Sequence, residues 1–194
     1  MKTLKAALLT LALPAALAAQ MPAPTANPIT TVFRTRTLAL QRNLAQAFDS
    51  IPESKFGFRP TPAQLTIGYI AQHLANDNNF FCNNFGAMKA TVSARDSSTA
   101  DSVKATWPKD SLVAKMKASF AFCESALNQL DDTKLAEAFT MTFGGQSRPS
   151  SRVSMVLGHV IDMADHYSQI ANYMRLNNMI PPTALPRPAR PAGQ

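Results

Sequence analysis

The sequence has few cysteines and lacks the short motifs that identify many enzyme classes. Its two cysteines are Cys82 and Cys123. It contains no cysteine-based metal motif, nucleophile elbow or phosphate-binding loop. No internal repeat and no convincing strand pattern is found either. These absences leave the reaction class open and favour a helical protein.

Long apolar runs are also lacking, except at the N-terminus. Lys2 and Lys5 precede an uncharged run from Ala6 to Leu13, and small residues follow as far as Ala19. This is the layout of a secretory signal peptide, and the run is shorter than the roughly 20 residues that cross a bilayer. We therefore expect residues 1–19 to be cleaved, leaving an exported protein, periplasmic or extracellular, with no membrane anchor.

Positive charge is not concentrated in any one segment. The formal net charge is +7, and loss of Lys2 and Lys5 with a signal peptide would lower it from +7 to +5. Nucleic-acid-binding proteins gather Lys and Arg on one face with aromatic side chains between them. The scattered charges here predict no nucleic-acid partner.

Proline-rich segments mark both ends of the mature chain. Residues 20–28 form a predicted linker and residues 181–194 a predicted tail, and we expect both to be extended and mobile. Residues 29–180 between them are sufficient for one domain with a hydrophobic core.

Four segments within this domain have apolar residues at helical spacing. The predicted helices cover residues 29–51, 63–86, 110–130 and 150–177. Asp110 is the expected N-cap of the third helix, while Pro149 and Ser150 should open the fourth. A long connection, residues 86–108, joins the second and third helices. The predicted fold class is all-α, a four-helix bundle.

The two cysteines lie on apolar faces of neighbouring predicted helices. In an oxidising compartment such a pair favours a disulfide, with Cα atoms within about 7 Å of each other. A reactive thiol or a metal ligand is the alternative role.

All three histidines lie on predicted helices. At 100° per residue, His159, Asp162 and His166 fall within an arc of about 60° on the fourth helix. His73 shares one side of the second helix with Asp77 and should also face the interior. Bundle interiors bind metals through inward His and carboxylate groups, often with two ligands one turn apart. Asp162 and His166 have this spacing.

His159 is a weaker candidate ligand. Seven residues separate it from His166, about 10.5 Å along a helix axis. We therefore expect His159 in the core, outside the coordination sphere. In the alternative interpretation, all three histidines are hydrogen-bonded core residues and no metal is bound.

Five short segments carry a family resemblance and together span nearly the whole mature chain. They are Phe56-Gly-Phe-Arg-Pro-Thr-Pro62, Ile70-Ala-Gln-His-Leu74, His166-Tyr-Ser-Gln169, Asn172-Tyr-Met-Arg175 and Ile180-Pro-Pro182. These segments resemble the DinB-like superfamily of helical metal-binding proteins. The resemblance implies an up-down-down-up bundle, in agreement with the long second connection.

The resemblance also implies a metal bound by the helix-two histidine and by an H-x-x-x-H-x-x-Q motif in helix four. By position, His73 and His166 are ligands, Gln169 is the motif glutamine, and the first motif histidine falls on Asp162. Aspartate binds zinc and other divalent ions as well. The predicted ligands are therefore His73, Asp162 and His166, with zinc preferred over nickel, iron or manganese.

Members of the DinB-like superfamily include thiol-dependent transferases and isomerases. Three functions agree with the resemblance to this superfamily. The first is a metal-dependent hydrolase or transferase acting on a small molecule, with Asp77, Asp165 or Tyr167 handling protons. The second is a non-catalytic module that binds a metal or small ligand. The third is a structural bundle with a vestigial site. A homodimer is a further arrangement that the sequence allows.

Overall fold

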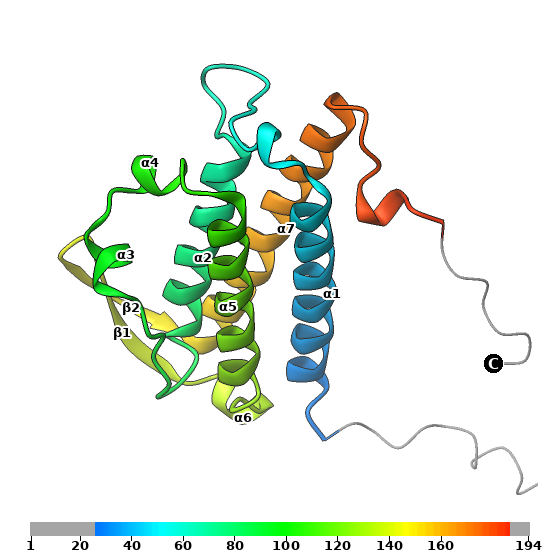
Figure 1. The fold of residues 1–194 in the computed structure, drawn as a ribbon. Helices are drawn as coiled ribbons and strands as arrows, with labels where there is room; N and C mark the ends of the chain where they lie inside the picture. Colours follow the sequence, from blue (N-terminus) through cyan, green and yellow to red (C-terminus); the bar gives the residue numbers. More distant parts are fainter. Residues whose placement is uncertain (1–25, 187–194) are drawn as a thin grey trace, which may run out of the picture.

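Four long helices lie side by side in the computed structural model, which describes residues 26–186 (Figure 1). They are α1 (Pro28–Ser50), α2 (Ile67–Cys82), α5 (Lys109–Leu127) and α7 (Arg152–Leu176). Helix α2 packs against α5 and α7, and α1 packs against the same two helices. Each long helix overlaps a predicted one, and the described chain is mostly helical, as predicted. The predicted signal peptide 1–19, with most of the linker, lies outside the described residues.

The shorter elements connect the long helices. They are η2 (Glu53–Lys55), α3 (Ala94–Ser98), α4 (Asp101–Lys104), α6 (Asp132–Leu135), the strands β1 (Ala138–Phe143) and β2 (Gln146–Ser151), and η3 (Pro182–Ala184). In Figure 1, α2 and α5 run in the same direction, opposite to α1 and α7. The connection carrying α3 and α4 must therefore return along the length of α2 before α5 begins.

Local capping determines where the helices begin, and it corrects several predicted boundaries. The second helix begins at Ile67 and not at residue 63, because the Thr66 side chain accepts a hydrogen bond from the Tyr69 N–H. The third helix follows Pro108 and has no side-chain cap, so Asp110 is not its N-cap. Asp110 lies in the first turn, where a negative charge is favourable near the helix N-terminus.

A β-hairpin, absent from the predicted fold, precedes α7. Strands β1 and β2 pair antiparallel, and Gly144 and Gly145 form the turn with φ values of 58° and 76°. Positive φ at both central residues is typical of a tight hairpin turn. Pro149 and Ser150 therefore belong to β2, and the N-cap of α7 is Ser151, whose hydroxyl accepts a hydrogen bond from the Ser154 N–H. The prediction of an all-α fold is wrong at this segment.

The hydrophobic core has two parts separated by a polar layer. One part packs between the four long helices and includes Leu74, Met116 and Met163, and the other lies towards the hairpin and includes Met141 and Val156. Between them lie three buried polar side chains, those of Asn78, Ser119 and His159. Asn78 is hydrogen-bonded to both Ser119 and His159. Each comes from a different helix, so their hydrogen bonds fix how α2, α5 and α7 align.

The predicted disulfide is present at this end of the core. Cys82, the last residue of α2, is bonded to Cys123 in α5, and their Cα atoms are 5.2 Å apart. Neither sulfur is a free thiol in this state. The bond ties the end of α2 to the last part of α5.

Partly buried ion pairs hold the long connection against α2 and α5. Lys115 of α5 lies 2.7 Å from the Asp96 carboxylate of α3 and donates to Asn76 of α2 at 3.0 Å. Lys104 of α4 pairs with Asp101 at 2.8 Å and with Asp96 at 3.3 Å. Asp101 also accepts a hydrogen bond from Asn76, and α4 therefore packs beside α2.

The predicted C-terminal tail begins with an ordered turn instead of an extended chain. Helix η3 packs beside α1, and the Tyr167 hydroxyl donates to Thr183 Oγ1 at 2.9 Å and accepts from the Thr183 N–H at 3.0 Å. Residues 187–194 of the tail lie outside the described residues. Within residues 26–186, no helix is both long enough and apolar enough to span a membrane.

Removing the disulfide should lower stability without unfolding the domain. We expect the double variant Cys82→Ala and Cys123→Ala to lose about 2–4 kcal/mol of unfolding free energy, because the unfolded chain is no longer cross-linked. Urea denaturation followed by circular dichroism measures this loss. Wild-type protein with a reductant should match the variant, and equal midpoints for oxidised wild type and variant would contradict the prediction.

Gly68 should tolerate no side chain, because a Cβ atom there would overlap the carbonyl oxygen of Ala105. Backbone atoms cannot move aside as a flexible side chain can, so Gly68→Ala should lose about 1–3 kcal/mol of stability. Gly57→Ala is the matched control, because a Cβ atom there meets nothing within 4 Å. Equal melting temperatures for the two variants would refute the expected overlap.

Candidate metal centre

Two residue pairs, each one helical turn apart, face each other across α2 and α7. His73 Nε2 lies 3.2 Å from Asp77 Oδ2 on α2, and His166 Nε2 lies 3.5 Å from Asp162 Oδ1 on α7. One potential ligand atom from each of the four residues lies within 4.8 Å of the others. The structure therefore brings together the predicted His73, Asp162 and His166, and adds Asp77. We call these four residues the His–Asp group.

Packing of the two helices explains why the group forms. Residues at i and i+4 lie on the same side of a helix. His73 and Asp77 therefore face α7 together, and Asp162 and His166 face α2. The rings of His73 and His166 meet edge to face, with centroids 5.0 Å apart. Buried Leu74 and Met163, adjacent in sequence to members of the group, anchor both helices in the core.

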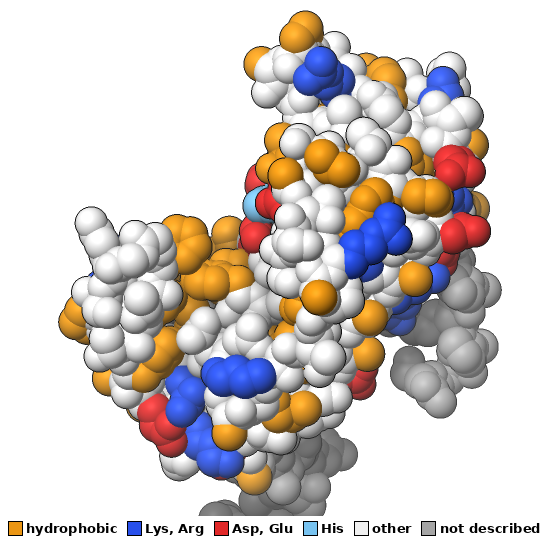
Figure 2. All heavy atoms as spheres, turned by 60° about the vertical axis from the view of Figure 1, so that its left-hand side comes forward, with side chains coloured by type: hydrophobic (Ala, Val, Ile, Leu, Met, Phe, Trp, Pro, Cys, Tyr) orange, Lys and Arg blue, Asp and Glu red, His pale blue; other side chains and the backbone are white. Residues whose placement is uncertain are grey.

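The members of the group differ in their exposure to solvent. Side-chain exposure falls from 31% for His73 to 7% for His166. Figure 2 shows a hollow on this face, with histidine and acidic side chains together at its upper edge and hydrophobic side chains along its floor. A small molecule could reach the exposed His73 side of the group more easily than the buried His166 side.

Burial and mutual repulsion shift the protonation of the group. Burial, together with the nearby Asp162 carboxylate, raises the pKa of Asp77 to about 7. Burial and the neighbouring His166 lower the pKa of His73. For His166, burial favours the neutral ring, but the hydrogen bond and charge of Asp162 outweigh it and raise the pKa. Two carboxylates this close are poorly compensated by the protein alone.

Several buried atoms of the group lack hydrogen-bonding partners. Within the described chain, nothing bonds to Asp162 Oδ2 or His166 Nδ1, although both atoms are buried. Buried polar atoms without partners are unfavourable by about 1–3 kcal/mol each. A divalent cation would compensate the paired carboxylates and accept lone pairs from the imidazoles, so the donor set fits a metal ion.

The other candidate residues lie elsewhere. Gln169 donates to exposed Asp165 at 2.8 Å, so neither belongs to the group. The Tyr167 hydroxyl bonds to Thr183 at the C-terminal turn. Of the three proton-handling candidates, the structure places only Asp77 in the His–Asp group. Its spacing from His73 repeats the spacing of Asp162 and His166, a signal that places it on the same side of α2 as His73.

His159 lies in the core, outside the His–Asp group. Its Nε2 is 2.9 Å from Asn78 Oδ1 and 3.8 Å from Cys82 Sγ. The side chain is fully buried. Cys82, Cys123 and His159 also lie within 4.8 Å of one another, but the two sulfurs are bonded to each other.

Comparison with known proteins identifies the family. The DinB superfamily profile matches residues 36–170. This match covers more than half of the chain and includes every member of the His–Asp group. The chain therefore belongs to the DinB superfamily.

Solved structures share the fold at low sequence identity. A DinB-like protein from Bacillus cereus ATCC 10987 is 14% identical with a TM-score of 0.60, covering 77% of this chain and 93% of its own. A conserved protein from Enterococcus faecalis is 15% identical with a TM-score of 0.56, covering 76% and 96%. The mycothiol-dependent maleylpyruvate isomerase is 14% identical with a TM-score of 0.57, covering 73% of this chain and 60% of the isomerase. A search of curated proteins gives no match.

The buried His159 should make stability depend on pH. Burial lowers its pKa from 6.5 to about 4. As the pH falls, His159 is therefore protonated in the unfolded chain before it is protonated in the folded protein. His159 then lowers the stability of the fold below about pH 6.5 and does not affect it well above that pH. Between about pH 7 and pH 5 this loss should be about 2 kcal/mol.

The variant His159→Gln keeps a hydrogen-bonding side chain but cannot titrate, so it isolates this contribution. Urea midpoints of wild type and variant should be compared at both pH values. Wild type should lose more stability than the variant on acidification. Parallel losses would show that His159 titrates normally in the folded protein.

Proposed function

We propose that the protein binds one divalent metal ion through His73, Asp162 and His166, with Asp77 beside it. The observation that carries the proposal is the group itself, in which four ligand-type side chains from facing helices lie within 4.8 Å of one another. Buried Asp162 Oδ2 has no hydrogen-bonding partner among residues 26–186. Two imidazoles and two carboxylates suit zinc, nickel, iron and manganese. Zinc is the preferred ion because it commonly binds both ligand types with low coordination number.

The proposed activity is metal-dependent hydrolysis or group transfer on a small molecule. A bound metal of this kind would supply Lewis-acid polarisation and a more acidic water. His73, Asp162 and His166 would hold it, and Asp77 Oδ2 is placed to hold a proton at the solvent-exposed side. The partial exposure of His73 leaves room for a substrate to approach.

Membership of the superfamily supports metal binding, but it does not identify the reaction. The superfamily includes metal-binding proteins and mycothiol-dependent enzymes, but at 14% identity the isomerase supports only the shared fold. In Figure 1, α1 and α7 run in one direction and α2 and α5 in the other, which supports an up-down-down-up bundle. The disulfide supports an exported protein, because such bonds persist mainly in oxidising compartments.

Metal analysis of variants tests the ligand assignment. Asp162→Ala and His166→Ala should each lower metal affinity by about 100-fold or more, since even loss of an outer-sphere partner lowers it about 10–100-fold. His159→Gln is the control and should keep wild-type affinity. Affinities come from titration with zinc after chelation, and stoichiometry from elemental analysis. Unchanged binding in Asp162→Ala together with loss in His159→Gln would show that the wrong residues were chosen.

A non-catalytic metal-binding module is the second candidate, because the Asp77 proton and the exposed His73 edge are compatible with either role. Metal-restored turnover of any small-molecule ester, amide or thiol-transfer substrate distinguishes an enzyme from a module. Activity that survives in His166→Ala would contradict a metal-dependent mechanism.

A further inference from the structure

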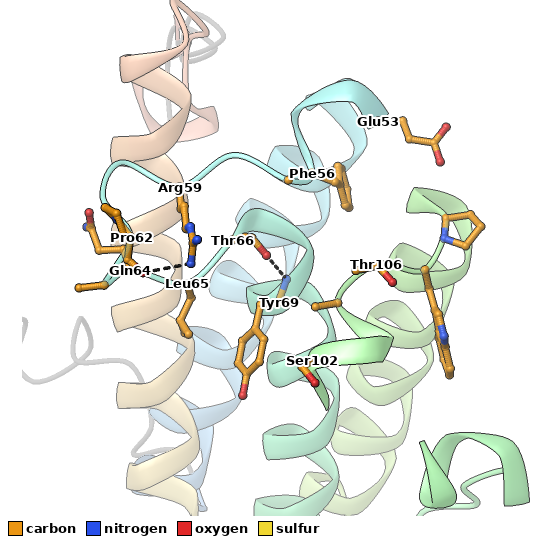
Figure 3. A pocket seen from close by; sticks show the side chains of 15 residues that line it. Glu53, Phe56, Arg59, Pro62, Gln64, Leu65, Thr66, Tyr69, Ser102 and Thr106 are labelled. Atoms are coloured by element: carbon orange, nitrogen blue, oxygen red, sulfur yellow. Dashed lines mark hydrogen bonds between the residues drawn. The ribbon is translucent and has the colours of Figure 1, made fainter. Parts of the chain in front are cut away.

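A cavity of about 770 Å³ lies beside the His–Asp group, near the start of α2 (Figure 3). Its walls come from the segment that follows η2, the first turn of α2, and α4 with its link to α5. Its volume is typical of sites for small molecules. The Phe56–Pro62 segment, which carries part of the family resemblance, supplies one wall and contributes no residue to the His–Asp group.

The cavity has flat apolar walls. Phe56, Tyr69 and Trp107 line it together with Leu65 and Pro62. Phe56 is buried, so its position is fixed by the core. Aromatic walls favour flat apolar ligands, because ring stacking adds to the burial of apolar area.

One charged group in the cavity wall has no acidic partner. Among residues 26–186, Arg59 forms no ion pair, and its Nη1 donates only to the Pro62 carbonyl oxygen at 3.0 Å. By contrast, Glu53 accepts the Lys109 backbone N–H at 3.2 Å. Figure 3 shows Arg59 on the same side of the cavity as Thr66 and Tyr69, and Glu53 on the other side. The remaining guanidinium donors of Arg59 are free to bind a carboxylate in two-point fashion.

The N-terminus of α2 does not compete for an anion. Its first N–H groups are already bonded: Ile67 to the Phe58 carbonyl, Gly68 to the Phe56 carbonyl and Tyr69 to the Thr66 hydroxyl. Arg59 is the one cationic side chain among the described residues that line the cavity, so an anion there would be attracted to Arg59.

Tyr69 connects this cavity to the His–Asp group. Its ring lines the cavity and lies 6.0 Å from the His73 ring, centroid to centroid. Ser102, another lining residue, follows Asp101, whose carboxylate accepts a hydrogen bond from Asn76 of α2. A ligand held at Arg59 and stacked on Tyr69 would extend towards His73.

We propose that this cavity binds the substrate of the metal centre, and that the substrate is an aromatic carboxylate. Arg59 binds the carboxylate, and the walls formed by Tyr69 and Trp107 bind the ring. The substrate assignment rests on the proposed function, whereas binding of an aromatic carboxylate in the cavity does not.

The only tryptophan of the chain, Trp107, reports binding directly. Phenylpropionate titrated into chelator-treated wild type should change the Trp107 fluorescence and saturate. Phenylpropionamide, which lacks the charge, and propionate, which lacks the ring, should each bind at least about tenfold more weakly. Equal binding of all three compounds, or no saturable change with phenylpropionate, would overturn the proposal.

Two arginine variants form a matched pair for this assay. Arg59→Gln should bind phenylpropionate and phenylpropionamide equally, because only the guanidinium distinguishes them. Arg95 lies 4.9 Å above the Trp107 ring but lines a different pocket, so Arg95→Gln should keep the preference for the carboxylate. Equal loss of preference in both variants would indicate a general charge effect and overturn the role of Arg59.

Metal measurements on the same proteins separate this inference from the proposed function. Arg59→Gln should keep its metal, and His166→Ala should lose its metal yet still bind phenylpropionate. In wild type loaded with cobalt(II), phenylpropionate should change the visible absorption spectrum. An unchanged spectrum at saturation would show that the cavity acts apart from the metal centre and would overturn the substrate assignment. Metal binding without phenylpropionate binding would refute the cavity proposal alone.

Discussion

The hydrogen bonds of Asn78 fix α2 against two neighbouring helices, and the candidate site depends on that alignment. The Asn78 side chain donates to Ser119 of α5 and pairs with His159 of α7, both at 2.9 Å. All three side chains are buried, so sliding α2 would leave polar groups without partners, at about 1–3 kcal/mol for each. Because Asp77 is the adjacent residue, the same bonds determine which residues of α7 it meets.

Helix α2 carries the functional features in order along its length. Gly68 allows the close approach of the α4–α5 link, Tyr69 forms the wall of the cavity, and His73 and Asp77 belong to the His–Asp group. Cys82 then ties the end of the helix to α5. One rigid helix, held at both ends and in the middle, therefore sets the position of the cavity relative to the proposed metal ion.

The electrostatics of the His–Asp group agree with the proposed cation. Burial and the nearby Asp162 carboxylate raise the pKa of Asp77 to about 7, and buried Asp162 Oδ2 has no partner within the described chain. An aspartate stands where the first motif histidine of the family is expected, and this adds a negative charge to the site. The second carboxylate makes the group more suitable for a divalent cation than a set of neutral imidazoles alone.

The sequence by itself determined the four long helices, because their apolar residues recur at helical spacing. It also predicted His73, Asp162 and His166 as candidate metal ligands, because helical periodicity shows which side chains share a face and the family resemblance points to these positions. The hairpin was missed although residues 139–143 alternate between apolar and polar side chains, and Gly144 and Gly145 follow them as a turn signal. Only the tertiary structure decided that Asp77 joins the His–Asp group, because periodicity within one helix does not show which face of another helix it meets. That pairing follows from the alignment of α2 and α7, which depends on buried contacts between residues distant in the chain.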